Sequence, residues 1–263
     1  MKNQTHFQLR DPLYVGLDIE TAPACAYADL PESIRAYVDR KIERGQKTDP
    51  ELDYTKFASL HPAFGRIVCL SVGRFHADDD GDTIITRSYS GGEGEILETF
   101  DRTFARFRPV FVHFNGINFD LPFILMRMRV AGITCSIPGF EDSGRGGGVA
   151  HRDVYEILSG RDRARSLSLV AAAHLAGVPA PKNDLDGAGV AATFAAGQIG
   201  RISRYCERDV ATTLNIFRRL VLLRPVISPE LCYWKDDSGY LRSIDFGGDS
   251  EDSPTFARVE IGQ

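Results

Sequence analysis

Two carboxylates, those of Asp18 and Glu20, lie two residues apart at the end of an apolar segment that begins at Leu13. Because side chains alternate between the two faces of a strand, both acids share one face. Such a pair repels itself and favours a cation between its members, and a divalent metal ion is the simplest candidate. Gly16 shares this face and leaves room for a ligand or for backbone. A solvated strand end explains the pair equally well, so this segment leaves both interpretations open.

A third acid, Asp120, follows a short apolar run at residues 110–114 and precedes a predicted helix. One interpretation is structural, because an acid in the first turn of a helix interacts favourably with the helix dipole. The other is functional, because α/β sheets bind ligands beyond the carboxyl ends of their central strands. The segment itself favours neither interpretation.

Tyr205 and Asp209 are four residues apart in a predicted helix and therefore lie on one helical face. They border the apolar line through Ile202, Cys206 and Val210, at the edge of the buried stripe. An exposed Asp beside arginines, with a Tyr that only packs, is the structural alternative. Because Asp is unfavourable in the middle of a helix, we favour a functional interpretation.

The elements that must position these residues follow from hydrophobic periodicity. Strands are predicted at residues 13–19, 66–72, 83–89, 110–114 and within 149–157, and helices at 31–44, 93–107, around 121–128, 166–175 and 202–223. A linker is predicted after residue 44, and the pattern weakens beyond Pro225. Strands in hairpin order, followed by alternating strand and helix, predict an α/β domain with a mixed sheet.

Composition narrows the class of protein. The chain has 263 residues and a net charge of −5, which argues against a protein that coats nucleic acid through a broad basic surface, although not against an enzyme that acts on it. No apolar run is long enough for a membrane span, and the polar start lacks the apolar stretch of a signal peptide. Five scattered cysteines predict reduced thiols in a cytoplasmic protein without a zinc site.

Taken together, the three acidic segments resemble the three motifs of DEDD-type 3′–5′ exonucleases. The segments are Asp18-x-Glu20, Asn-x-Phe-Asp ending at Asp120, and Tyr205-x-x-x-Asp209, and the last of them is typical of the tyrosine subgroup. The chain also resembles, in more detail, the stand-alone predicted exonucleases related to the proofreading domain of family-B DNA polymerases. Its connecting segments at residues 61–68, 151–154 and 182–187 share this resemblance, which spans residues 14–220.

The resemblance implies a ribonuclease-H-like fold, a mixed five-stranded sheet flanked by helices. It would occupy residues 1–224 and be followed by a C-terminal extension, residues 225–263, of unknown role. It also implies two divalent ions, Mg²⁺ or Mn²⁺, and a tyrosine that orients the attacking water, because a phenol of pKa ~10 is a poor base at neutral pH. The implied metal ligands are Asp18, Glu20, Asp120 and Asp209, the water-orienting residue is Tyr205, and the implied substrate contacts are Ile19, Thr21, Asn115, Phe119 and Lys182.

The expected activity is removal of nucleotides from the 3′ end of single-stranded nucleic acid, with DNA favoured and 5′-monophosphates released. An exoribonuclease acting on RNA 3′ ends and a non-catalytic nucleic-acid-binding module are the alternatives. Four converging acids argue against the binding module, which has no need of them. The sequence identifies no protein partner.

Overall fold

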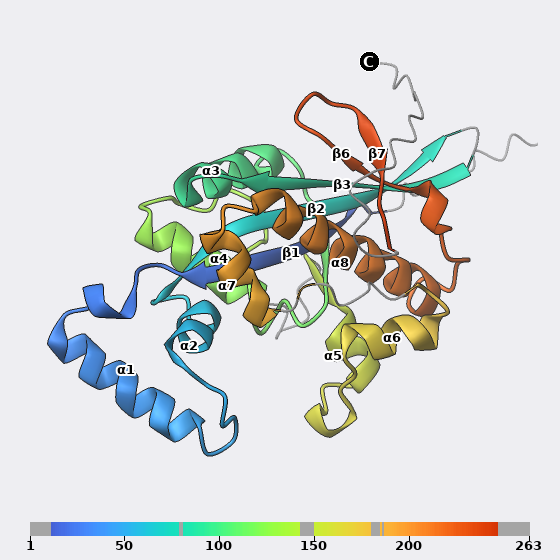
Figure 1. Cartoon of the computed structure of the whole chain (residues 1–263). Coiled ribbons are helices and arrows are strands. Elements are labelled where there is room, and N and C mark those ends of the chain that lie inside the picture. The colour runs from blue at the N-terminus through green and yellow to red at the C-terminus, as the bar shows by residue number, and fades with distance from the viewer. Residues whose placement is uncertain (1–11, 79–80, 143–149, 180–184, 186, 247–263) are drawn as a thin grey trace, which may run out of the picture.

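The computed structural model describes residues 12–78, 81–142, 150–179, 185 and 187–246 (Figure 1). Its helices are α1 (Glu32–Gly45), α2 (Tyr54–Leu60), α3 (Glu93–Phe104), α4 (Asp120–Val130), α5 (Val154–Ser159), α6 (Leu169–Ala176), α7 (Gly187–Ala195) and α8 (Ile199–Leu220). Short 3₁₀ turns lie at Tyr27–Asp29, Arg163–Arg165 and Pro229–Leu231. Within these residues, no helix combines the length and apolar character needed to cross a membrane.

The strands are β1 (Tyr14–Pro23), β2 (Gly65–Asp78), β3 (Gly81–Ser90), β4 (Val110–His113), β5 (His151–Asp153), β6 (Cys232–Lys235) and β7 (Leu241–Ser243). They form one sheet in the order β5-β4-β1-β2-β3-β6-β7. β1, β2 and β3 are antiparallel neighbours, whereas β4 and β5 join the other side of β1 in parallel. The predicted α/β class and mixed sheet are confirmed.

The described sheet has seven strands rather than the predicted five. β6 pairs in parallel with β3, and β7 completes an antiparallel hairpin with β6. These two strands are four and three residues long, too short to produce a recognisable alternation in the sequence. Part of the segment expected to be a C-terminal extension thus continues the sheet.

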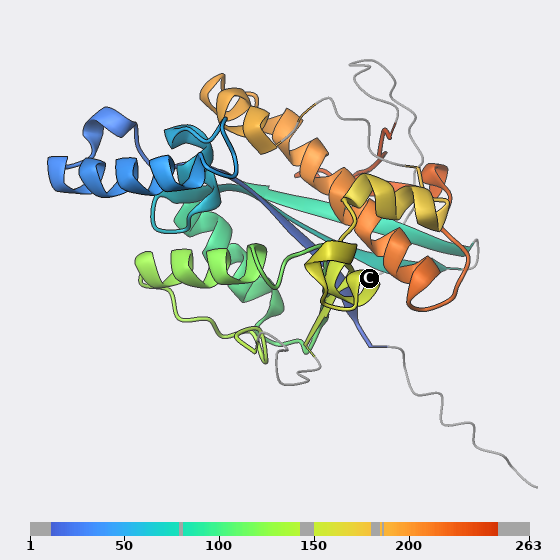
Figure 2. The ribbon, with the colours of Figure 1, turned by 90° about the horizontal axis from the view of Figure 1, so that it is seen from below.

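The strand predicted within residues 149–157 is present as β5, and a helix begins in the same segment. β5 ends at Asp153, and α5 begins at the next residue because the Asp153 side chain accepts the main-chain N–H groups of Tyr155 and Glu156. A helix was also missed in the predicted linker, where α2 begins after its own cap, Asp53. In both views α1 and α2 lie together at one end of the sheet (Figures 1 and 2).

Helices cover both faces of the sheet. α3 and α4 pack on one face, against the apolar side chains of Val15, Leu17 and Ile19. α6 and α8 pack on the other face, and α8 runs across β1, β2 and β3 (Figure 1). The alternation along β1 therefore directs its apolar residues to α3 and α4, and its even-numbered residues to α8.

Glycine lets α8 approach the sheet closely. A Cβ on Gly16 would lie 2.9 Å from both Leu214 Cγ and Val210 Cγ1, and one on Gly73 would lie 2.7 Å from Val210 Cγ1. Gly16 and Gly73 are also paired across β1 and β2. The room expected beside Gly16 is thus taken by apolar side chains of a helix, which brings α8 close to β1.

Candidate active site

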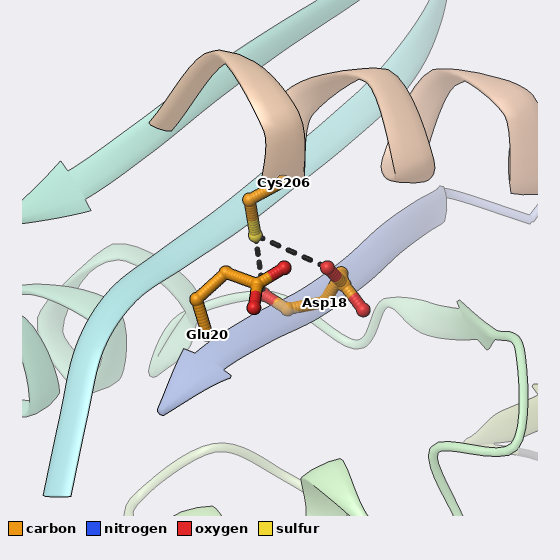
Figure 3. Close-up of side chains that lie close together, drawn as sticks. All are labelled: Asp18, Glu20 and Cys206. Carbon is orange, nitrogen blue, oxygen red and sulfur yellow. Dashed lines mark hydrogen bonds between the residues drawn. The ribbon is translucent and has the colours of Figure 1, made fainter. Parts of the chain in front are cut away.

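Strand β1 presents the first two acids toward α8 (Figure 3). Glu20 is 8% exposed and Asp18 is half-buried. The regular pairing of β1 with β2 shifts between Glu20 and Thr21, directly after the acidic pair. Such an irregularity bends a strand and redirects its side chains. Here it lies on the C-terminal side of the acidic pair in β1.

Cys206 of α8 lies against the acidic pair, which sequence reasoning did not foresee. Its Sγ donates to Asp18 Oδ2 at 3.2 Å and to the main-chain oxygen of Asp18 at 3.5 Å (Figure 3). Ligand atoms of Asp18, Glu20 and Cys206 all lie within 4.8 Å of one another. The signal was present, because Cys206 follows Tyr205 on the helix stripe that faces the sheet, but the residue was taken only as core.

Asp120 is the first residue of α4 and is 3% exposed. Its Oδ1 accepts a hydrogen bond from the main-chain N–H of Ile19 at 3.0 Å. That N–H lies between Asp18 and Glu20 along the chain, so Asp120 is fixed beside the β1 pair. The structural and functional interpretations of Asp120 are compatible, since the residue both opens a helix and faces the other acids.

Helix α8 supplies Tyr205 and Asp209, both half-buried. The negative charge of Asp209 raises the pKa of Asp18 and of Glu20, which places its carboxylate within electrostatic reach of both. Burial, followed by the charges of Asp209, Glu20 and Asp18, raises the pKa of the Tyr205 hydroxyl above its ordinary value. The structure therefore brings the three motifs together.

The burial of these carboxylates and their mutual repulsion favour the binding of a cation. Loss of contact with water raises the pKa of Asp18 and Glu20 well above their usual values, and neighbouring acids raise both further. Burial likewise raises the pKa of Asp120 to about 7, although the hydrogen bond from Ile19 opposes this. In the part of the chain that the structure describes, neither Asp18 nor Glu20 forms an ion pair with Lys or Arg. A bound divalent ion would balance this charge, so these residues fit the expected metal.

The structure describes four of the five expected substrate contacts: Ile19 and Thr21 flank Glu20 on β1, Phe119 directly precedes Asp120, and Asn115 lies in the loop between β4 and α4. Ile19 is buried in the core and offers its main chain to Asp120, while Thr21 donates from Oγ1 to the main-chain oxygen of Ser59 at 2.7 Å. Asn115 accepts from Asn118 Nδ2 at 3.1 Å, and Phe119 is half-buried. Lys182 lies outside the described residues. The substrate roles of all five stay predictions.

Comparison with solved structures supports the fold. The chain is similar to the family B DNA polymerase from the hyperthermophilic archaeon Pyrobaculum calidifontis, with a TM-score of 0.50 and 19% sequence identity. The match covers 80% of this chain and 25% of the polymerase chain, so the protein corresponds to about a quarter of its structural relative. The fold is accordingly ribonuclease-H-like, as the resemblance implies.

Comparison of sequences identifies the family. No curated protein matches the chain. A family model described as "Predicted 3'-5' exonuclease related to the exonuclease domain of PolB" matches residues 56–235, more than half of the chain. This span contains Asp120, Tyr205 and Asp209, while Asp18 and Glu20 precede it. The chain belongs to this family of predicted 3′–5′ exonucleases related to the exonuclease domain of PolB.

Proposed function

We propose that the protein is a two-metal-dependent 3′–5′ exonuclease that shortens single-stranded DNA and releases 5′-monophosphates. The observation that carries the proposal is the convergence of four carboxylates from three separate elements, β1, α4 and α8, beside one tyrosine. Burying several acids together destabilises a metal-free fold, so their arrangement is best explained by cations that they bind during function.

Asp18, Glu20, Asp120 and Asp209 are the proposed metal ligands. Two bound divalent ions would stabilise the attacking and leaving oxygens of an in-line displacement at phosphorus. Carboxylate oxygens favour Mg²⁺ or Mn²⁺. Cys206 does not alter this preference, because burial raises the pKa of its thiol well above the usual value, so the thiol keeps its proton and donates a hydrogen bond to Asp18.

Tyr205 is proposed to orient the attacking water through its hydroxyl. Its raised pKa keeps the phenol protonated at neutral pH, so it can donate a hydrogen bond but cannot act as a general base. Asp209 lies one helical turn further along α8. Its proposed role is to bind metal with its negative charge, and not to orient the attacking water.

We propose a cytoplasmic location as well, supported by the thiols. All five cysteines are free. Free thiols are typical of a reducing compartment.

Single-stranded DNA and RNA, labelled at either the 3′ or the 5′ end, test the proposal directly with Mg²⁺, Mn²⁺ or EDTA. We expect shortening from the 3′ end only, abolished by EDTA. Asp18→Ala, purified in parallel, should lose about 10³-fold or more, which identifies this chain as the source of activity. Activity that persists in EDTA would contradict the two-metal mechanism, and faster degradation of RNA would favour the exoribonuclease alternative.

A further inference from the structure

Asp153 is a further buried acid near Asp120, and both of its carboxylate oxygens accept hydrogen bonds from main-chain N–H groups. It ends strand β5 and is 3% exposed. Its Oδ1 accepts the N–H of Asn115 at 2.8 Å and of Tyr155 at 3.0 Å, and its Oδ2 accepts the N–H of Ile117 at 3.0 Å. One carboxylate thus joins two segments, the start of α5 and the loop between β4 and α4.

That loop needs an external anchor. Asn115 adopts a φ of +67°, a backbone conformation that residues other than glycine rarely adopt. At Gly116 a Cβ would lie 2.5 Å from Nδ1 of His113, so the loop folds tightly back on β4. Hydrogen bonds to Asp153 from both sides of Gly116 offset the cost of this conformation.

The loop leads directly to a proposed metal ligand. The N–H of Leu121 donates to the main-chain oxygen of Gly116 at 2.8 Å, which ties the first turn of α4 to the loop. Asp120 lies in that turn and accepts the N–H of Ile19. A continuous set of hydrogen bonds therefore runs from Asp153, through the loop, to Asp120 and strand β1.

Asp153 is placed to act through the loop and not as a ligand itself. Both of its oxygens already accept main-chain N–H groups, which compensate for its buried charge. Its charge nevertheless reaches Asp120, whose pKa it helps to raise. The two carboxylates are close, but it is Asp120 whose charge acts on Asp18 and Glu20 of β1.

We infer that Asp153 is a positioning residue, which holds the Asn115–Phe119 loop so that Asp120 can bind a divalent ion together with Asp18. This inference rests on the proposed function, because it assigns a role toward the same metal site.

Two substitutions separate the loop contact from the helix cap. Asn and Ser are both favourable N-cap residues, so Asp153→Asn and Asp153→Ser should preserve the start of α5. In Asp153→Asn, one acceptor oxygen is replaced by an NH₂ group that faces N–H donors. In Asp153→Ser, the serine side chain is too short to reach both the start of α5 and the loop between β4 and α4. If one variant fails to fold, the other still tests the contact.

The measurements are Mn²⁺ affinity by calorimetry and amide hydrogen exchange in residues 114–121. Outer hydrogen-bond partners of metal ligands are typically worth about 10–100-fold in metal affinity, and we expect a loss in that range. Because Oδ1 accepts both the cap N–H groups and Asn115, we expect faster exchange of the Ile117 amide alone in Asp153→Asn and of both the Asn115 and Ile117 amides in Asp153→Ser. In an Asp120→Asn background, the same substitution should cause no further loss of affinity, because the residue acts through Asp120.

Asp101→Asn is the matched control. Asp101 is also buried, and it anchors a different loop by accepting the N–H of Ser136 at 2.7 Å and the hydroxyl of the same residue. We expect this variant to lose stability without losing Mn²⁺ affinity. Equal losses of affinity in Asp153→Asn and Asp101→Asn, or a further loss in the Asp120→Asn background, would overturn the positioning role. Failure of the unmodified protein to bind Mn²⁺ would instead overturn the proposed function, and the inference with it.

Discussion

The carboxylate of Asp120 accepts a hydrogen bond from the main-chain N–H of Ile19 at 3.0 Å, across 101 positions of sequence. Ile19 stands between the two acids of β1, so this bond fixes the third acid relative to the first two. The side chain of Ile19 is buried in the core on the opposite face of the strand. One residue therefore anchors the sheet to α3 and α4 and anchors Asp120 to the site.

Replacing Asp120 by Asn should separate charge from geometry. The amide oxygen can still accept the Ile19 N–H, while the negative charge that a cation requires is lost. We expect activity to fall by about 10²-fold or more and the thermal midpoint of the metal-free protein to rise, because burial opposes ionisation of Asp120. Activity assays and thermal melts in EDTA test both expectations, and a lower midpoint would contradict the second.

Metal-free stability should decrease as pH rises through the range in which Asp120 ionises. The pKa of Asp120 in the fold is about 7, above its unfolded value near 3.9, so the folded state binds more protons between these limits. The associated stability is present at low pH and is lost as pH rises toward 7 and beyond. Mg²⁺ or Mn²⁺ should restore it by binding the ionised form.

The histidines require a control in this experiment. Burial lowers the pKa of His113 and His151, so their contribution is lost in the opposite direction, as pH falls. The difference in thermal midpoint between the unmodified protein and Asp120→Asn, measured from pH 5 to 8 in EDTA, isolates the carboxylate. A difference that does not change with pH would contradict the expectation.

Tyr205→Phe should reduce turnover without weakening metal binding. The ring remains half-buried on α8, and only the hydroxyl that is proposed to orient water is lost. We expect a fall of about 10–100-fold in kcat, smaller than that of Asp18→Ala, with Mn²⁺ affinity unchanged. Tyr89→Phe removes a hydroxyl that faces Thr103 and serves as the control. A weakened Mn²⁺ affinity in Tyr205→Phe would assign the hydroxyl to the metal site instead.

Cys206→Ser should leave the choice of metal unchanged. A serine hydroxyl can still donate to Asp18, so the carboxylate keeps its hydrogen bond. We expect activity within about threefold and the same relative rates with Mg²⁺ and Mn²⁺, because the thiol is not a proposed ligand. Rates measured with each ion test this, and a changed order would make the sulfur a ligand.

Gly16→Ala should destabilise the fold by about 1–3 kcal/mol, since the added Cβ would meet Val210 and Leu214 at 2.9 Å. Gly94→Ala, in α3, meets nothing within 4 Å and should stabilise by about 0.4–1 kcal/mol. Urea unfolding compares the two variants. Equal changes in the free energy of unfolding would show that α8 does not pack closely enough on β1 to exclude a Cβ at residue 16.

The sequence carried enough information to predict the faces of β1 and the grouping of the motifs. Alternation placed Asp18 and Glu20 together, and i, i+4 spacing placed Tyr205 and Asp209 together, because both depend only on local geometry. The contact between Cys206 and Asp18 depends on how closely α8 approaches the sheet, which local periodicity does not encode. The alanine-rich helix α7 and the short strands β6 and β7 lack a clear pattern and were missed for that reason.

Strand β6 covers what would otherwise be an open edge of the sheet at β3. Without it, the main chain of β3 would present unpaired N–H and C=O groups along Ile84–Thr86 to any other extended segment. A chain cut after residue 224 would keep all five acidic and tyrosine side chains of the proposed site, yet it would expose a strand edge that favours self-association. Residues 232–243 therefore cover the edge of β3, while the catalytic chemistry is proposed to lie elsewhere in the sheet.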